Sequence, residues 1–307
     1  MAVEAQVRAD SSGWAGVGAL RVAADYVGLL KPRIILLLVV TELGAMIVAA
    51  RGLPHAWLLL GSLGGGALAA GGASAVNCWF DRDIDALMPR TRRRPIPAGR
   101  IAPAAGLGFG IFVGLAGVVL VAISSNLLAA ALTGSGGLIY VFVYTMWLKR
   151  ATPQNIVIGG AAGAFPPLVG WAAVTGAISP LAWALFAIIF FWTPPHFWAL
   201  ALLLRRQYAA ANVPMLPVVV GAHRTSRAIV SYTIVMIAVS LVPGLWLGPI
   251  YVLAAVALGG GFLILAWRAM RSDGGTVAIT LFHYSLAYLA LLFSAAAIAA
   301  VVPSVTT

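Results

Sequence analysis

Long apolar runs separated by short polar connections dominate this chain, and their lengths predict its elements. Nine such runs are present, at 34–50, 57–80, 102–122, 127–147, 155–175, 179–203, 227–247, 249–267 and 277–301. Each approaches the about 20 residues that a helix needs to cross the hydrocarbon core of a bilayer. The pattern therefore predicts an all-α polytopic membrane protein whose nine transmembrane helices form one bundle.

Composition supports a membrane protein and argues against a soluble one. The 307 residues are 62% hydrophobic and 9% charged, whereas soluble domains carry about 25% charged residues. We expect residues 21–307 to form a single membrane domain that follows a disordered tail at 1–20. No apolar stretch before residue 27 predicts a cleaved signal peptide. The single cysteine, Cys78, excludes an intrachain disulfide and a thiolate metal site.

The distribution of basic residues predicts the orientation of the chain. With the N-terminus inside, eighteen of the nineteen Lys and Arg residues fall in inner segments, and only Arg51 lies outside. Such a bias follows the positive-inside rule, so it accounts for the net charge of +11 without nucleic acid as a partner. We therefore expect an integral protein of the bacterial plasma membrane, with a cytoplasmic N-terminus and an external C-terminus.

Small residues and prolines predict how the helices pack. Glycine, alanine and serine crowd the second run between 61 and 74, and small faces let helices approach closely in lipid. Two proline pairs, Pro166-Pro167 and Pro194-Pro195, should interrupt the fifth and sixth runs, because proline removes a backbone donor and kinks a helix. Such breaks are tolerated where they line a cavity, so we expect the bundle to surround a central cavity.

Polar chemistry is concentrated between Asn77 and Arg100. Asn77, Asp81 and Asp85 are spaced four residues apart, which on a helix places them on one face over roughly 12 Å. Mg²⁺ prefers such oxygen ligands and takes others from water and phosphates. We therefore predict that these three residues hold Mg²⁺ and are catalytic, against the simpler reading that they are solvated helix caps. Asp83 points off this face and should pair with an arginine.

An arginine cluster follows the acidic motif. Arg90, Arg92, Arg93 and Arg94 lie in a loop that also contains three prolines. Guanidinium groups bind phosphates with paired hydrogen bonds, so we interpret the loop as a lid that clamps a diphosphate. The alternative is surface charge that attracts anionic lipid.

These residues resemble the UbiA superfamily of intramembrane prenyltransferases. Its signature, N-x-x-x-D-x-x-x-D, matches Asn77, Asp81 and Asp85. Further stretches resemble the protoheme IX farnesyltransferase branch, and together they cover nearly the whole chain beyond residue 20: DYVGLLKPRI at 25–34, RTRRRPIPAGRI at 90–101, YTMWLKRATPQNIVIGGAAGAFPPLVGW at 144–171 and TPPHFWALALLLRRQYAAANVPMLPVV at 193–219.

The resemblance implies a reaction in which haem B, farnesyl diphosphate and water give haem O and diphosphate. Mg²⁺ would assist ionisation of the diphosphate, and the farnesyl cation would add to a haem vinyl group. The lipid bilayer would surround the protein, and haem A synthase or terminal-oxidase assembly would lie downstream. The expected diphosphate contacts are Arg82, Arg90, Arg94, Lys149, Arg150 and Arg206. The residues expected to line the cavity are Tyr144, Asn155, Trp192, Phe197 and Trp198.

His196 follows the second proline pair inside a predicted span. In a chain that resembles a haem enzyme, we interpret it as an axial or orienting haem contact. The alternative is a structural hydrogen bond, for example to a carbonyl freed by Pro194-Pro195. His283 in the ninth run is a second haem candidate.

One departure from the family pattern affects the metal site. A second acidic cluster is expected just before Tyr208, but that place reads Arg205-Arg206-Gln207, and no Asp or Glu occurs between Asp85 and Asp273. Either the motif at Asn77 holds the metal alone with waters, or Arg206 contacts the diphosphate directly. Weak or absent activity is a third possibility.

Three competing functions stay open from the sequence. A UbiA-type prenyltransferase acting on another aromatic acceptor would share the acidic motif. A transporter would share broken helices and a midplane cavity. A structural membrane subunit would leave the Asn77–Asp85 spacing and the arginine loop unexplained.

Overall fold

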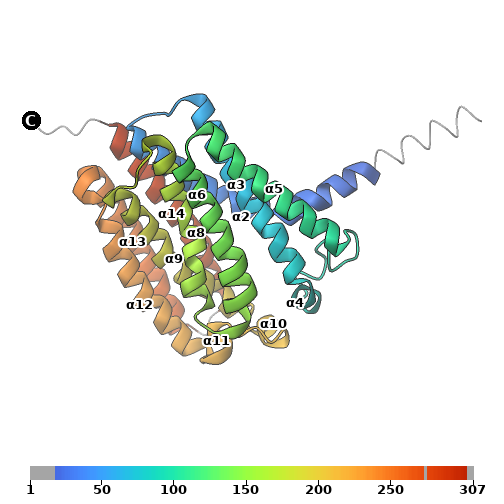
Figure 1. Ribbon diagram of the computed structural model, residues 1–307. Helices are drawn as coiled ribbons and strands as arrows, with labels where there is room; N and C mark the ends of the chain where they lie inside the picture. Colours follow the sequence, from blue (N-terminus) through green and yellow to red (C-terminus); the bar gives the residue numbers. More distant parts are fainter. Residues whose placement is uncertain (1–17, 273–274, 303–307) are drawn as a thin grey trace, which may run out of the picture.

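The computed structural model describes residues 18–272 and 275–302, and within these ranges the chain is helical and has no strand (Figure 1). This confirms the predicted all-α class. After a helix at 18–30, the elements are α2 Pro32–Ala50, α3 Ala56–Phe80, α4 Arg82–Leu87, α5 Pro103–Ser124, α6 Leu127–Leu138, the π-helical η1 Ile139–Leu148, α7 Lys149–Ala151, α8 Asn155–Thr175, α9 Pro180–Leu203, α10 Arg205–Ala210, α11 Leu216–Val219, α12 Gly221–Leu241, α13 Gly244–Arg271 and α14 Gly275–Val301.

Eight helical segments in the described ranges are long and apolar enough to cross a membrane, with α6, η1 and α7 forming one continuous span at Leu127–Ala151. The remaining predicted span corresponds to α12, which has 21 residues but begins with polar residues, among them His223 and Arg224. It starts and ends six residues earlier than the predicted 227–247. Because its first turns are polar, hydropathy does not detect them, and Pro243 follows its end closely.

The N-terminal boundary also differs from the prediction. Residues 1–17 of the expected tail lie outside the described part, but 18–20 already belong to the helix at 18–30. Asp25 on this helix pairs with Arg100 at 2.8 Å, and the Tyr26 ring lies 4.8 Å from the Phe109 ring. These contacts attach the helix to the end of the arginine loop and to α5, which the sequence pattern alone did not indicate.

Helices α3 and α5 run side by side (Figure 1) and approach as closely as their small residues predict. A Cβ atom added to Gly72 would lie less than 3.0 Å from the backbone nitrogen of Gly114, and one added to Gly117 would lie equally close to that of Ala69. Only glycine fits such distances. This packing holds the C-terminal half of α3, which leads into the acidic motif.

The prediction that the proline pairs interrupt two spans is wrong. Helices α8 and α9 continue through Pro166-Pro167 and Pro194-Pro195 without a break. A proline removes one donor, but a helix packed against neighbours can keep its path, and Pro194 and Pro195 are buried. The Thr193 hydroxyl donates to the Ile189 carbonyl at 2.8 Å just before the second pair. The expected central cavity stays a prediction.

Short helices gather at one end of the bundle. Figure 1 shows α4, α10 and α11 together at the lower end, whereas α14 ends at the opposite side. The acidic motif and the segment 205–219 are far apart in the sequence, yet they share this end. The candidate site is therefore assembled here.

Candidate active site

The acidic motif crosses the junction between α3 and α4. Helix α3 ends at Phe80 and α4 begins at Arg82, so the expected single helix is interrupted at Asp81. The backbone hydrogen bonds from Asp81 to Asn77 (2.9 Å) and from Asp85 to Asp81 (2.8 Å) preserve the four-residue spacing. The side chains of all three motif residues are buried.

Asn77 lies at the centre of a buried polar network. Its Nδ2 donates to Asp81 Oδ2 at 2.7 Å and to Thr145 Oγ1 at 3.0 Å, and its Oδ1 accepts from Lys31 Nζ at 2.8 Å. An ammonium group can only donate, so the contact with Lys31 establishes which end of the amide carries the oxygen. The amide nitrogen therefore faces the Asp81 carboxylate.

The π-helical segment η1 supplies one member of the network and leads into another. Its wider turns bring Thr145 to Asn77, and α7 follows it directly, where Lys149 Nζ donates to Asp81 Oδ2. Such π segments often occur at functional sites. On the same segment, Tyr144 packs so closely against α8 that a Cβ atom at Gly159 would lie less than 3.0 Å from its ring.

The second carboxylate pairs with the arginine loop. Arg94 Nη1 donates to Asp85 Oδ2 at 2.6 Å, and the Arg94 side chain is 27% exposed. Thr91 Oγ1 also donates to the Asp85 carbonyl at 3.0 Å. The loop is thus folded onto the acidic motif, with Arg90 exposed beside it.

Asp83 pairs with Arg150, which confirms the expected arginine partner. The guanidinium donates to both carboxylate oxygens at 2.7 and 2.8 Å, lies 3.7 Å from Asp81 Oδ1 and stacks on the Phe80 ring at 4.9 Å. The hydrogen bonds from Arg150 lower the pKa of Asp83 to about 2. Arg150 therefore reaches the edge of the motif from α7.

Arg82 points elsewhere. Its Nη1 donates to the Trp79 carbonyl at 2.8 Å, and its guanidinium stacks on the Trp79 ring at 5.4 Å. None of its contacts in the described ranges joins the acid network, although the sequence suggested a diphosphate contact.

The donor set fits a hard divalent cation that takes further ligands from elsewhere. Asp81 Oδ1 is buried and has no hydrogen-bond partner in the described structure. The described residues contain no group of three or more His, Cys, Asp or Glu side chains that could hold a metal alone, and Asn77 Oδ1 is occupied by Lys31. Carboxylates with open oxygens suit Mg²⁺, which completes its shell with water and phosphate.

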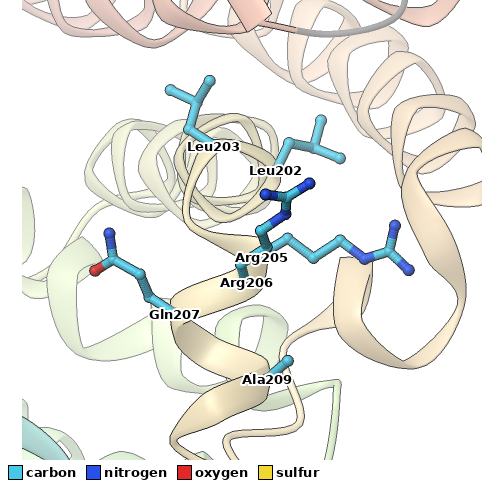
Figure 2. Close-up of a pocket in the computed structure, with 6 residues that line it drawn as sticks. All are labelled: Leu202, Leu203, Arg205, Arg206, Gln207 and Ala209. Carbon is cyan, nitrogen blue, oxygen red and sulfur yellow. The ribbon is translucent and has the colours of Figure 1, made fainter. Parts of the chain in front are cut away.

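The segment Arg205-Arg206-Gln207, which stands where the second acidic cluster was expected, lies on α10 and lines a pocket of about 540 Å³. Its lining residues are Leu202, Leu203, Arg205, Arg206, Gln207 and Ala209. Figure 2 shows the Gln207 side chain pointing away from the two arginines, and its buried Oε1 has no hydrogen-bond partner in the described part of the chain. Arg206 is exposed, and within the described residues no hydrogen bond or ion pair joins its side chain to the acid network.

The His196 side chain contacts residues of α14. Its Nδ1 lies 2.6 Å from Ser285 Oγ, and its ring stacks on Trp192 at 4.2 Å and on Phe282 at 4.8 Å. His196 thus makes a structural hydrogen bond, as the alternative expected, although its partner is Ser285 and not a carbonyl freed by the proline pair. The neighbouring Phe197 ring lies 6.5 Å away.

Three other predicted residues occupy different environments. Trp198 is buried and its Nε1 has no hydrogen-bond partner among the described residues. Asn155 is fully buried, and while its Nδ2 donates to the Thr152 carbonyl at 2.8 Å, its Oδ1 is unpaired within the described ranges. His283 is exposed, and its Nδ1 contacts the Ile279 carbonyl of its own helix.

A comparison with protein families matches residues 37–287 to the UbiA prenyltransferase family. The chain belongs to this family. A protoheme IX farnesyltransferase of Gloeobacter violaceus is 54% identical over 274 residues, which are 88% of this chain and 90% of that protein. A protoheme IX farnesyltransferase of Roseiflexus sp. (strain RS-1) is 51% identical over 280 residues, which are 91% of this chain. Those residues are 52% of the Roseiflexus protein, so this chain spans about half of its length.

Solved structures support the UbiA fold. A digeranylgeranylglyceryl phosphate synthase superposes with a TM-score of 0.75 at 15% identity, covering 92% of this chain and 99% of that one. A UbiA homologue from Archaeoglobus fulgidus, bound to DMAPP and Mg²⁺, superposes with a TM-score of 0.64 at 18% identity, covering 89% and 99%. The resemblance expected from the acidic motif is confirmed, and a UbiA-fold protein binds a divalent metal.

Two residues of the candidate site, Lys31 and Thr145, were not predicted from the sequence. Lys31 ends the first helix in a left-handed conformation (φ 55°) before Pro32, which directs the chain into α2 next to Asn77. A Lys-Pro pair at the start of an apolar run was an available signal. Thr145 carried none, because a threonine inside an apolar run is ordinary.

Proposed function

We propose that this protein is an intramembrane prenyltransferase that converts haem B, farnesyl diphosphate and water into haem O and diphosphate. The observation that carries the proposal is the buried motif Asn77, Asp81 and Asp85, which is paired with cationic side chains in a chain 54% identical to a protoheme IX farnesyltransferase. Buried carboxylates surrounded by cations suit a metal-assisted diphosphate site.

Asp81 and Asp85 are the proposed Mg²⁺ ligands. Asn77 Oδ1 becomes a third ligand once its hydrogen bond from Lys31 is broken. When bound, the metal neutralises negative charge on the leaving diphosphate. The absence of a hydrogen-bond partner for Asp81 Oδ1 in the described structure and the Mg²⁺ bound by the A. fulgidus homologue support this assignment. Because α10 carries Arg206 where the family carries an acid, we assign the metal to the first motif alone and a direct diphosphate contact to Arg206.

The cations around the motif are the proposed diphosphate clamp. Lys31, Lys149 and Arg94 already lie within hydrogen-bond distance of the motif. In the complex they would exchange a carboxylate or amide partner for phosphate oxygens, and positive groups placed where charge develops lower the barrier. Arg90 and Arg150 extend the clamp at its edges, whereas Arg82 faces away.

Aromatic residues near His196 are the proposed haem and cation environment. Trp192 and Phe197 lie around the imidazole, and aromatic faces attract a carbocation. A site within the bilayer also keeps water from the farnesyl cation before it meets the vinyl group. We assign His196 to the haem iron, and Tyr144, Asn155 and Trp198 to the cavity wall.

The proposed location is the bacterial plasma membrane, with the N-terminus cytoplasmic and the site at the cytoplasmic end. The placement of α4, α10 and the arginine loop at one end of the bundle supports this orientation. Haem A synthase or terminal-oxidase assembly is the proposed consumer of the product.

The test is product formation by the purified protein in detergent with haem B, farnesyl diphosphate and Mg²⁺, followed by mass spectrometry. Haem O that disappears when Mg²⁺ is chelated supports the proposal. Prenylation of an aromatic acid instead of haem would favour the other UbiA activities. Substrate flux across proteoliposomes without any product would favour a transporter.

A further inference from the structure

The imidazole of His196 is enclosed on both faces and at one nitrogen. Trp192 and Phe282 stack nearly parallel to it, with interplanar angles of 15° and 23°, so they cover opposite faces. Nδ1 contacts Ser285 Oγ at 2.6 Å, and Ser285 is fully buried. Within the described ranges no hydrogen bond is made by Nε2. The ring is therefore held rigidly, with a single free polar atom.

The hydrogen bonds of Ser285 determine which nitrogen of His196 carries the proton. Ser285 Oγ also lies 2.6 Å from the Phe282 carbonyl. A carbonyl only accepts, so the single hydroxyl hydrogen of Ser285 is used in that bond. The hydroxyl oxygen must then accept from Nδ1–H of His196. A neutral imidazole protonated at Nδ1 carries its lone pair on Nε2.

Trp192 fixes the same arrangement from the other helix. Its Nε1 donates to the Ser285 carbonyl at 2.8 Å while its ring stacks on His196. Helices α9 and α14 are thus joined at one point by a stacked ring, a hydroxyl and a carbonyl. Each of these contacts limits rotation of the imidazole.

We propose that Ser285 is a positioning residue of the haem site, which holds His196 as the Nδ1–H tautomer so that Nε2 binds the iron of the haem substrate. This inference rests on the proposed function, in which His196 contacts haem. Metal-binding histidines usually donate their other N–H to a partner that orients the ring and makes the ligand more basic. Ser285 occupies that role here.

The first test measures haem binding by the full-length protein in detergent. Ferric haem B is titrated into wild type, Ser285→Ala and Ser285→Thr, with absorption and electron paramagnetic resonance spectra reporting imidazole ligation. Removing such a partner typically weakens metal affinity about 10- to 100-fold, so we expect that loss in Ser285→Ala together with less of the imidazole-ligated form. Ser285→Thr keeps the hydroxyl and should restore both.

Ser240→Ala is the matched control. Ser240 is also fully buried, pairs with Tyr288 Oη at 2.7 Å and donates to the Met236 carbonyl at 2.8 Å. It has the same pattern of bonds as Ser285 but does not touch His196. Haem affinity and the haem spectrum should be unchanged in this variant. If Ser240→Ala loses as much haem affinity as Ser285→Ala, the loss comes from general destabilisation of the protein, and the positioning role of Ser285 is wrong.

The second test observes the tautomer directly and needs no variant at position 285. In protein labelled with ¹⁵N-histidine, the signals missing from His196→Gln belong to His196. We expect a protonated Nδ1 and a Nε2 with a free lone pair before haem is added. The opposite tautomer would overturn the inference even if Ser285→Ala did not fold.

The outcomes separate this inference from the proposed function. If His196→Ala keeps the imidazole-ligated spectrum, the haem contact is wrong and the role of Ser285 fails with it. If His196→Ala loses that spectrum while Ser285→Ala binds haem like wild type, only the positioning role fails. Lower turnover in Ser285→Ala with unchanged haem affinity would also exclude iron ligation as the reason for the contact.

Discussion

At the scale of single residues, the two carboxylates of the acidic motif and the neighbouring Asp83 lie in three different environments. Asp81 is fully buried and forms an ion pair with Lys149. Asp85 is buried and forms an ion pair with Arg94, whereas Asp83 is exposed. A buried carboxylate has lost its hydration, so its charged form is stable only when nearby cations or hydrogen-bond donors compensate for that loss. The two buried acids are thus suited to bind a cation, whereas Asp83 forms a surface ion pair.

Replacing either buried acid by asparagine should stop catalysis. Asp81→Asn and Asp85→Asn each remove one charged ligand with little change in volume, so haem O formation should fall by about 100-fold or more. Mass spectrometry of the product and calorimetric Mg²⁺ binding in the presence of farnesyl diphosphate measure both effects. Turnover at the wild-type rate in either variant would remove the metal assignment.

Asp83→Asn is the control for these variants. Asp83 is 60% exposed in its side chain, and exposed ion pairs contribute about 0–1 kcal/mol, so turnover should stay near that of wild type. The lowered pKa, about 2, means that the pair with Arg150 stabilises the fold above the unfolded pKa of about 4. That contribution is lost only as pH falls toward 2, so thermal unfolding of wild type and Asp83→Asn should differ equally at pH 6 and pH 8.

At the scale of elements, the position of the site depends on how closely α3 packs against α5. Gly72 meets backbone atoms of α5 and not a side chain that could rotate away. The crossing therefore cannot accept a larger residue without moving the helices apart. Because α3 leads directly into Asn77, such a shift would also displace the acid network.

Gly72→Ala should destabilise the protein, and Gly108→Ala should not. The added methyl group at position 72 overpacks the crossing, at a cost of about 1–3 kcal/mol. Gly108 lies on α5, where a Cβ atom would meet no other atom within 4 Å, and alanine favours a helix over glycine. Thermal unfolding in detergent compares the two, and a lower midpoint for Gly108→Ala than for Gly72→Ala would contradict the packing argument.

At the scale of the whole molecule, the charged residues and the site occupy the same end of the bundle. The arginine loop, α4 and α10 gather there, whereas Arg51 is exposed in the connection between α2 and α3. A bilayer that follows the positive-inside rule would place the site on the cytoplasmic side. Water-soluble diphosphate could then enter and leave from the cytoplasm.

Cysteine labelling tests this orientation with little background, because the one native cysteine, Cys78, is buried. In intact cells a membrane-impermeant maleimide should label Arg51→Cys and leave Arg92→Cys unlabelled until the cells are opened. Both positions are exposed in the structure, so accessibility is matched. Labelling of Arg92→Cys in intact cells would mean that the arginine loop, and the site beside it, face the outside of the cell.

Several features could be predicted from the sequence because they depend on local pattern. Hydropathy reports helix length, so the spans were predicted well except for α12, whose first turns are polar. The Asn77–Asp85 spacing survived a helix break because the backbone hydrogen bonds around Asp81 keep the same spacing. The proline pairs misled the prediction, since packing against neighbours preserved α8 and α9.

Residue type and spacing along the chain were enough to establish the helical class, the membrane spans, the acidic motif and the family. The partners of the site residues, in contrast, depend on the packing of distant helices. Lys31 meets Asn77 across 46 positions, Lys149 meets Asp81 across 68, and Ser285 meets His196 across 89. Apolar periodicity shows which faces are buried, but it does not specify which polar side chains that packing brings together.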